Sequence, residues 1–297
     1  MFPRSFHYHR ASSLKEAAAM LSQLGGEAKL LAGGQSLIPL MKLRFANPRH
    51  LVDLNFVPDT AFIEEEQGAV RLGAMTRHAQ IEQSSLASTI PILHDCAAGI
   101  ADVQIRNRGT IGGSLAEADP SGDWATVLLT QTAAIRCMSP RGERTIALSD
   151  FIRDAYTTVL EHDELIQEVV VRKPGSGSGG AYVAFKRSAP VYPTASAAVQ
   201  LEMMGDVCKN AAIVLGCVGL TAVRVSEGDA ALRGSKLDEK TIAIAMDAAR
   251  AAADPQSDMR GSADYKRALV AALVKRAIEV AMRRARGEHV EMSHIYA

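Results

Sequence analysis

The 297-residue sequence predicts an α+β protein of two domains. At roughly 150 residues per domain, this length favours two domains. The first half alternates short apolar strands with short helical segments, whereas the second half places three strands before two helices. Between the halves, Lys173–Gly180 is rich in glycine and serine and marks the boundary. The expected organisation is a first domain over 1–174, a linker over 175–180 and a second domain over 181–297.

Composition and charge match an ordinary globular protein. Hydrophobic residues make up 47% and charged residues 22%, which is enough apolar material for a core in each domain. The 33 basic and 33 acidic residues give a net charge of +0, which argues against binding to nucleic acid or to an anionic membrane. The N-terminus has no apolar leader, and the run Ala211–Val223 is too short to span a bilayer. We therefore expect a cytoplasmic protein with no transmembrane segment.

The sequence lacks the motifs of several familiar sites. Its cysteines form no CxxC pair, so we expect neither an iron–sulfur cluster nor another metal site on this chain, and their small number suits a reducing compartment. There is no P-loop, no HExxH and no GxSxG. Gly175, Gly177 and Gly180 match GxGxxG, but a strand is expected to follow them where the dinucleotide fingerprint needs a helix. We therefore interpret this match as part of the linker.

Local signals define most of the expected elements. A capping box at Ser13 and Glu16 predicts a helix over Leu14–Leu24, and a strand at Lys29–Ala32 precedes a helix over Leu37–Arg44. The other strands expected in the first half are His50–Leu54, Ala61–Glu66, Ala69–Leu72, Ala134–Met138, Thr145–Leu148 and Leu165–Val171, and the other helices are Ala79–Gln83, Ile90–Ala98 and Trp124–Gln131. The second half is expected to contain strands Tyr182–Lys186, Ala195–Met203 and Ala211–Leu220, and then helices over about Leu237–Ala253, capped near Ser235 and Asp238, and Ala263–Arg286.

Two similar glycine motifs stand out. Gly33-Gly34-Gln35-Ser36 follows a strand, and Ser36 is expected to cap the next helix, whose N-terminal N–H groups and dipole would face an anion. Gly112-Gly113-Ser114 follows Thr110 in a long connection over 106–123, where the paired glycines allow positive φ and a close approach of a ligand to the backbone. Free N–H groups and hydroxyls are donors to phosphate oxygens. One such loop is usually only a turn. Two loops brought together could clamp a diphosphate, which favours a dinucleotide ligand.

Other polar residues have more than one interpretation. Asp123 could accept a hydrogen bond from a ribose hydroxyl. Asp119 and Asp123 could form an acid–base pair, but the intervening Pro-Ser-Gly favours a turn in which Ser121 or Asp119 caps the following helix. His78 is expected to be structural or to lie at a cofactor edge. Lys186 could be a solvated strand-edge residue or could approach a cofactor between the domains. No residue is assigned a catalytic role.

Two segments carry a specific resemblance. Leu31–Arg44 and Gln104–Ser114 resemble the paired FAD motifs of the medium, flavoprotein subunit of molybdenum hydroxylases, the family of carbon monoxide dehydrogenase and xanthine dehydrogenase. The resemblance covers essentially the whole chain. It implies an FAD-binding fold of the vanillyl-alcohol-oxidase (PCMH) type with two subdomains of about 1–55 and 56–174. A small α+β domain with an antiparallel sheet and helices would follow it.

The resemblance also implies which residues contact FAD. Those implied at the diphosphate and ribityl chain are Ala32, Gly33, Gly34, Gln35, Ser36, Leu37, Thr110, Ile111, Gly112, Gly113 and Ser114. Asp123 would contact the adenosine ribose, Ile166 the adenine side, and Ile100 would make a supporting apolar contact. Lys186 matches a lysine near the flavin, and Tyr192 matches a tyrosine over one flavin face. The preceding Ala189-Pro190-Val191 departs from the Gly-Asp pair more common in the family.

The resemblance implies an electron-transfer subunit. FAD on this chain would take electrons from an iron–sulfur small subunit with 2Fe–2S clusters and pass them to an external acceptor: NAD, quinone or oxygen. A large subunit with a molybdenum cofactor would hydroxylate the substrate, and the assembly would be a dimer of heterotrimers. Two alternatives stay open: a self-contained FAD-dependent oxidase and a non-catalytic nucleotide-binding assembly module.

Overall fold

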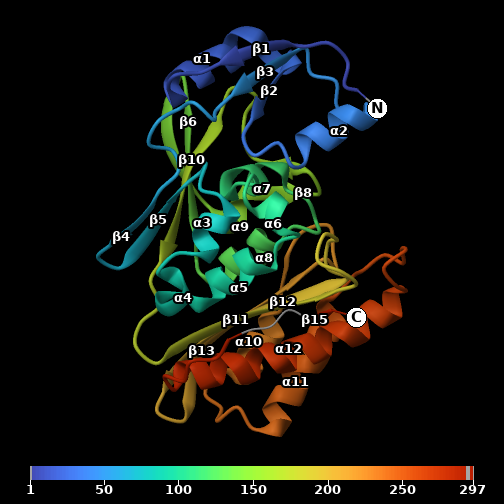
Figure 1. The fold of residues 1–297 in the computed structure, drawn as a ribbon. Coiled ribbons are helices and arrows are strands. Elements are labelled where there is room, and N and C mark those ends of the chain that lie inside the picture. Colours follow the sequence, from blue (N-terminus) through green and yellow to red (C-terminus); the bar gives the residue numbers. More distant parts are fainter. Residues whose placement is uncertain (1, 292–294, 297) are drawn as a thin grey trace.

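The structure is a computed structural model that describes residues 2–291 and 295–296. From one end to the other, it consists of a small parallel sheet, a five-stranded sheet, a layer of short helices, a second five-stranded sheet and an outer layer of helices (Figure 1). The two predicted domains also include a few residues outside the described ones, namely 1, 292–294 and 297. The mixed architecture confirms the predicted α+β class.

The N-terminal unit is a parallel sheet in the order β1-β3-β2, in which β1 was not predicted. Its strands and helices are β1 (His7–Arg10), β2 (Ala28–Leu31), β3 (His50–Asp53), α1 (Leu14–Leu24), a 3-10 turn η1 (Gly25–Glu27) and α2 (Leu37–Leu43). The Ser13 side chain caps α1 by accepting from the Glu16 N–H at 3.1 Å. The predicted N-cap at Ser13 is therefore confirmed, but the Glu16 carboxylate accepts from the Ser12 N–H at 2.7 Å in place of the Ser13 N–H that a full capping box needs.

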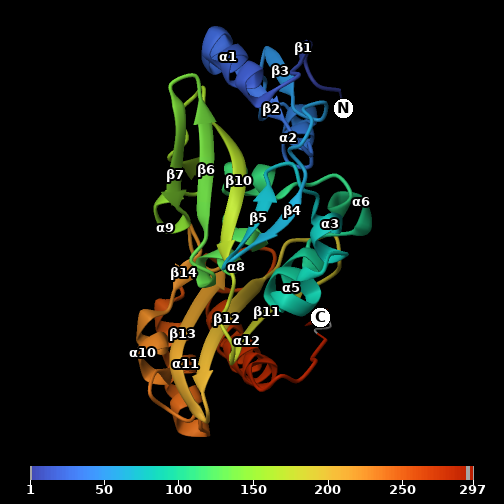
Figure 2. The ribbon, with the colours of Figure 1, turned by 90° about the vertical axis from the view of Figure 1, so that its left-hand side faces the viewer.

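The middle unit is an antiparallel sheet in the order β4-β5-β10-β6-β7, with helices on one face (Figure 2). Its strands are β4 (Ile63–Glu66), β5 (Ala69–Gly73), β6 (Ala134–Ser139), β7 (Gly142–Ala147) and β10 (Leu165–Arg172), and a small ladder joins β8 (Ile152–Asp154) to β9 (Thr157–Thr158). Its helices are α3 (His78–Glu82), α4 (Leu86–Thr89), α5 (Pro91–Gly99), α6 (Val103–Arg106), α7 (Ile111–Glu117), α8 (Asp123–Thr130) and α9 (Leu148–Phe151). The hairpin predicted at Gln67-Gly68 is confirmed as β4–β5.

The C-terminal unit is a second sheet in the order β14-β13-β12-β11-β15, antiparallel except for the β11–β15 pair. Its elements are β11 (Ser178–Lys186), β12 (Ala195–Met204), β13 (Val207–Gly216), β14 (Val223–Arg224), β15 (Ile295–Tyr296), α10 (Ser226–Leu232), α11 (Glu239–Ala252) and α12 (Ala263–Ala285). One face of this sheet packs on α12, and the other meets α5 and α8 of the middle unit (Figure 1). Helices α5 and α8 therefore lie between the two sheets.

The core follows this layering. Trp124 and Phe151 are fully buried in the cluster between the middle sheet and its helices, and Tyr182 of β11 joins the same cluster. A separate cluster fills the space between β11–β13 and the outer helices, with Val274 and Ile278 of α12 at its centre. At about 25 cal/mol per Å² of apolar surface removed from water, such burial is the main stabilising term in each layer.

Three details of the prediction are wrong. The predicted connection 106–123 contains helix α7, so Gly112 and Gly113 are helical and do not adopt the positive φ that glycine allows. Thr110 makes this possible because its side chain caps α7 by accepting from the Gly113 N–H at 3.1 Å. At the start of α8 the N-cap residue is Gly122, in place of Ser121 or Asp119, and at α11 it is Asp238 alone. These ends depend on local backbone geometry that residue type alone does not determine.

Candidate cofactor site

The two glycine segments are in direct contact. A Cβ added to Gly33 would lie 2.4 Å from the carbonyl oxygen of Arg108 and 2.8 Å from the Cα of Gly109. A Cβ added to Gly113 would lie 3.7 Å from the Cβ of Ala32. Since real Cβ atoms do not approach backbone atoms to 2.4 Å, only glycine at position 33 permits this approach. The structure therefore brings the two predicted motifs together.

The first segment presents a run of free backbone donors. Gly34 has φ +73°, which reverses the chain after Gly33, and a Cβ there would also meet Ile38 at 2.7 Å. In the part of the chain that the structure describes, the N–H groups of residues 33–37 donate to no protein acceptor. Except for Gly33, these residues are partly or well exposed. Such a run of amides suits a ligand with several acceptor oxygens, as a diphosphate has.

The second segment is held by the connection between β5 and α3. Ile111 N–H donates to the Thr76 carbonyl at 3.1 Å, and Gly112 N–H donates to the Ala74 carbonyl at 2.9 Å. His78 N–H in turn donates to the Gly109 carbonyl at 3.1 Å. These bonds form a short antiparallel bridge that fixes the start of α7 against the middle sheet.

A side-chain network links the two segments, and its members were not predicted. Asn55 Nδ2 donates to the Ala32 carbonyl at 2.9 Å. The Arg77 guanidinium donates to Asn55 Oδ1 and to the Arg108 carbonyl. Asn55 and Arg77 are ordinary polar turn residues in the sequence, so no local signal distinguishes them. Their role comes from contacts between distant parts of the chain.

The His78 side chain lies against the second segment at Gly109. It is 4% exposed, and its Nδ1 accepts from the Trp124 indole N–H at 3.1 Å. Burial, with smaller contributions from Arg77 and Arg106, lowers the pKa of His78 from 6.5 to about 3. The imidazole is therefore neutral at pH 7, with its proton on Nε2. This position fits the structural interpretation of His78.

Asp123 and Lys186 belong to a buried polar group between the middle and C-terminal units. The Tyr182 phenol donates to Asp123 Oδ1 at 2.6 Å. Burial raises the pKa of Asp123, and the Lys186 charge opposes this rise. Lys186 is 1% exposed and donates to the Gly99 carbonyl at the end of α5, directly before Ile100. Its interpretation as a solvated edge residue is therefore wrong.

The remaining predicted residues lie on different surfaces. Ile166 is buried in β10, opposite Cys137 of β6, within the core beside α7. Tyr192 is 47% exposed on the segment between β11 and β12. Burial and the Asp119 carboxylate raise the pKa of the Tyr192 phenol. Since Asp119 follows α7, the chain runs directly from the second glycine segment to the surroundings of Tyr192.

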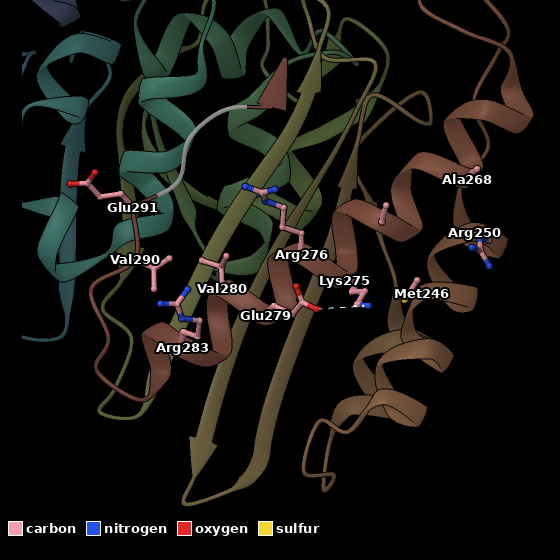
Figure 3. Close-up of a pocket in the computed structure, with 11 residues that line it drawn as sticks. Met246, Arg250, Ala268, Lys275, Arg276, Glu279, Val280, Arg283, Val290 and Glu291 are labelled. Atoms are coloured by element: carbon pink, nitrogen blue, oxygen red, sulfur yellow. Dashed lines mark ion pairs between the residues drawn. The ribbon is translucent and has the colours of Figure 1, made fainter. Parts of the chain in front are cut away.

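A groove of about 820 Å³ lies elsewhere, along α11 and α12 (Figure 3). Its lining includes Met246, Lys275, Arg276 and Val280, and none of the predicted FAD residues. This groove is therefore separate from the candidate cofactor site.

Within residues 2–291 and 295–296, no group of three or more His, Cys, Asp or Glu side chains has the arrangement of a metal site. None of the helices in this range is both long and apolar enough to cross a membrane. The four cysteines, Cys96, Cys137, Cys208 and Cys217, are unpaired in the structure.

Comparisons with known proteins agree with this geometry. The family model for the FAD binding domain in molybdopterin dehydrogenase matches residues 4–174, and that for the CO dehydrogenase flavoprotein C-terminal domain matches residues 180–281. The chain is 40% identical to the carbon monoxide dehydrogenase medium chain of Hydrogenophaga pseudoflava, over 96% of this chain and 99% of that protein. It is 39% identical to the alpha subunit of the 6-hydroxypseudooxynicotine dehydrogenase complex of Paenarthrobacter nicotinovorans, over 99% of this chain and 100% of that one.

Solved structures show the same fold. A chain of carbon monoxide dehydrogenase from Hydrogenophaga pseudoflava superposes with a TM-score of 0.93 at 41% identity, over 96% of this chain and 99% of that chain. A chain of quinoline 2-oxidoreductase from Pseudomonas putida superposes with a TM-score of 0.91 at 33% identity, over 98% and 100%. The chain belongs to the family of FAD-binding medium subunits of the molybdenum hydroxylases.

Proposed function

We propose that this chain carries FAD between its two glycine segments and transfers electrons within a molybdenum-containing hydroxylase. One observation carries the site: a run of free amides at residues 33–37 lies where Gly33 touches the backbone of Arg108. A diphosphate needs several donors in a small space, and this contact supplies them from one segment while the other closes the opposite side. The same observation favours a dinucleotide over a ligand with one phosphate.

The proposed FAD contacts are those of the sequence-based prediction. They are Ala32, Gly33, Gly34, Gln35, Ser36, Leu37, Ile100, Thr110, Ile111, Gly112, Gly113, Ser114, Asp123, Ile166, Lys186 and Tyr192. When bound, FAD supplies the electron-accepting and electron-donating chemistry, and the protein binds, orients and shields it. Tyr182 already donates to Oδ1 of Asp123, so we assign the adenosine ribose to Oδ2. Lys186 is buried and anchored at Gly99, which suits a fixed positive charge beside the flavin.

We further propose the partners of this chain. Curated relatives are medium chains or subunits of larger dehydrogenases, which supports an iron–sulfur small subunit and a molybdenum-cofactor large subunit beside it. We propose a dimer of these heterotrimers and an external acceptor of the NAD, quinone or oxygen class. The four unpaired cysteines suit a cytoplasmic location. We also retain the domain limits 1–174 and 181–297 as a proposal, with a linker predicted over 175–180 whose last three residues already belong to β11 (Ser178–Lys186).

The test is the FAD content of the complex purified with its native partners. Gly33→Val places a branched side chain against the Arg108 carbonyl, so we expect loss of most bound flavin absorbance per chain. Gly26→Ala is the matched control, because a Cβ there meets nothing within 4 Å. Full FAD stoichiometry in the Gly33→Val protein would refute the two-segment site. Substrate-driven flavin reduction by this chain without partners would instead indicate a self-contained oxidase, and a colourless protein that folds in the presence of FAD would indicate an assembly module.

A further inference from the structure

We infer that Arg77 is a binding residue of this site, because its guanidinium joins the two glycine segments and supplies the positive charge that faces the diphosphate. The inference rests on the proposed function. Arg77 lies in the connection between β5 and α3, far in sequence from both segments. Its backbone N–H donates to Gln80 Oε1 at 2.7 Å, which holds the residue at the start of α3. The side chain is therefore directed from a fixed backbone.

The Arg77 side chain completes a bridge of hydrogen bonds. On one side it donates to the Arg108 carbonyl, the atom that Gly33 approaches. On the other side it donates to Asn55 Oδ1, and Asn55 donates to the Ala32 carbonyl at 2.9 Å. The bridge thus runs from the residue before Gly33 to the residue before Gly109. A rigid, planar guanidinium can make both bonds at once, whereas a lysine ammonium lacks this fork geometry.

Arg77 forms no ion pair with any of the residues 2–291 and 295–296 that the structure describes. Arg77 is half-buried, and among the described residues no carboxylate lies within 4.0 Å of its guanidinium. Burial and the nearby Arg108 charge lower the pKa of Arg77, with Asp53 opposing them. An arginine stays protonated in proteins at neutral pH, so this arrangement leaves a partly desolvated cation whose nearby carboxylate, Asp53, is not in direct contact with it. An anionic ligand on the adjacent free amides would offset that cost.

Arg108 provides a matched control. It carries the same charge close to the same place, but its side chain is exposed and only its backbone carbonyl takes part in the bridge. Arg108→Gln therefore removes one positive charge and leaves the bridge intact. Arg77→Gln removes both the charge and the bridge. Arg77→Lys keeps the charge but lacks the planar guanidinium that makes both hydrogen bonds at once.

The experiment measures FAD binding to the purified complex after the flavin has been removed, at low and high salt. We expect Arg77→Gln to weaken FAD binding at least about tenfold, a loss the size of one good charged contact, and to reduce its salt dependence. Riboflavin, which has no phosphates, should bind the wild-type and Arg77→Gln proteins to a similar extent. Arg77→Lys should fall between wild type and Arg77→Gln, and Arg108→Gln should bind FAD within about threefold of wild type.

Each outcome decides a separate point. A wild-type complex that does not bind FAD would refute the proposed function. If the wild-type complex binds FAD and the Arg77→Gln protein binds it as tightly as the Arg108→Gln protein does, the proposed function stands. Only the role of Arg77 is then overturned. If Arg77→Gln does not fold, as judged by circular dichroism, Arg77→Lys decides: a threefold or greater loss of FAD affinity supports the inference, and an unchanged affinity overturns it.

Discussion

The Tyr182 phenol donates a 2.6 Å hydrogen bond to the Asp123 carboxylate, and both side chains are buried. Tyr182 lies in β11 of the C-terminal sheet, and Asp123 is the first residue of α8 in the middle unit. The bond therefore joins the two parts of the chain beside the residues proposed to contact FAD. A charged or polar group at such a place needs its partner, because the low-dielectric interior cannot replace a lost donor.

Tyr182→Phe should lower the free energy of unfolding by about 1–3 kcal/mol at pH 7, because the buried Asp123 loses its donor. Burial raises the pKa of Asp123 in the folded state, so the stability linked to its protonated form is lost as pH rises through that pKa. The hydrogen bond from Tyr182 opposes this rise in pKa because it stabilises the ionised carboxylate. The unfolding free energy that Tyr182→Phe loses relative to wild type should therefore be smaller at pH 4 than at pH 7. Urea unfolding of both proteins at the two pH values measures this loss. Tyr265→Phe, which alters a half-exposed phenol, is the control, and a Tyr182→Phe deficit no larger than the control's would contradict the assignment.

His78 should make the fold sensitive to acid. Its folded-state pKa of about 3 lies below the unfolded value of 6.5, so its contribution is complete above pH 6.5 and is lost as pH falls toward 3. His78→Gln keeps an acceptor for Trp124 but cannot be protonated. Its unfolding free energy should therefore fall less steeply on acidification, by up to about 1.4 kcal/mol per pH unit relative to wild type.

The measurement for His78 is a series of urea unfolding curves between pH 4 and pH 7. The exposed His162 provides the matched control, and His162→Gln should follow the wild-type slope. Parallel slopes for His78→Gln and wild type would show that His78 is not the responsible group.

Local sequence signals predict much of this fold. The N-cap at Ser13 and the hairpin at Gln67-Gly68 depend on residues within one turn of each other, and both predictions are confirmed. The two glycine motifs could be found for the same reason, since each is a short pattern with a physical cause. Their contact at Gly33 and Arg108 agrees with the expectation that they act together.

Other features depend on contacts between distant residues. Helix α10 contains Gly228, a poor helix former, and the sequence gives no sign of a helix there. The structure explains both the glycine and the helix. A Cβ on Gly228 would lie 3.0 Å from Ile213 Cδ1, so there is little room for a side chain at this position. The Asp229 side chain accepts from the Ile213 N–H at 2.7 Å, and this bond holds α10 against β13. The burial of Lys186 and the bridge through Arg77 arise in the same way, so periodicity and residue type could not predict them.

Arg284→Met should destabilise the protein by about 3–5 kcal/mol, because it leaves the buried Asp95 charge without its partner. Arg284 Nη1 lies 2.5 Å from Asp95 Oδ2, and both side chains are at most 6% exposed. This pair connects α12 to α5, and Arg284 also donates to the Gly180 carbonyl at 2.7 Å. The double variant Asp95→Asn with Arg284→Met removes the unpaired charge and should regain part of the loss. Chemical denaturation measures the unfolding free energies of the wild type, the two single variants and the double variant. Additive effects of the two substitutions on this free energy would argue against a coupled pair.

Arg260 should control the mobility of the segment that carries Tyr192. Its Nη1 donates to Ser121 Oγ at 3.2 Å and to the Pro193 carbonyl at 3.3 Å, and so it fastens this segment to the turn before α8. Arg260→Gln removes both bonds. Because Arg260 is partly exposed, the global stability should change by less than about 1 kcal/mol, since surface substitutions rarely cost more. Amide hydrogen exchange in residues 187–192 should nevertheless rise about fivefold, which corresponds to roughly 1 kcal/mol of local opening.

The control for this prediction is Arg250→Gln, which removes an exposed arginine paired with Asp247 on α11. It should leave exchange in residues 187–192 unchanged. If Arg260→Gln also leaves it unchanged, the segment is held by other contacts, such as that of the Arg187 side chain with the Met259 carbonyl at 3.5 Å. A rise in exchange confined to 187–192 would instead identify Arg260 as the contact that holds Tyr192 in place. Among the described residues, the only other side-chain interaction that the substitution removes is the ion pair of Arg260 with Asp258.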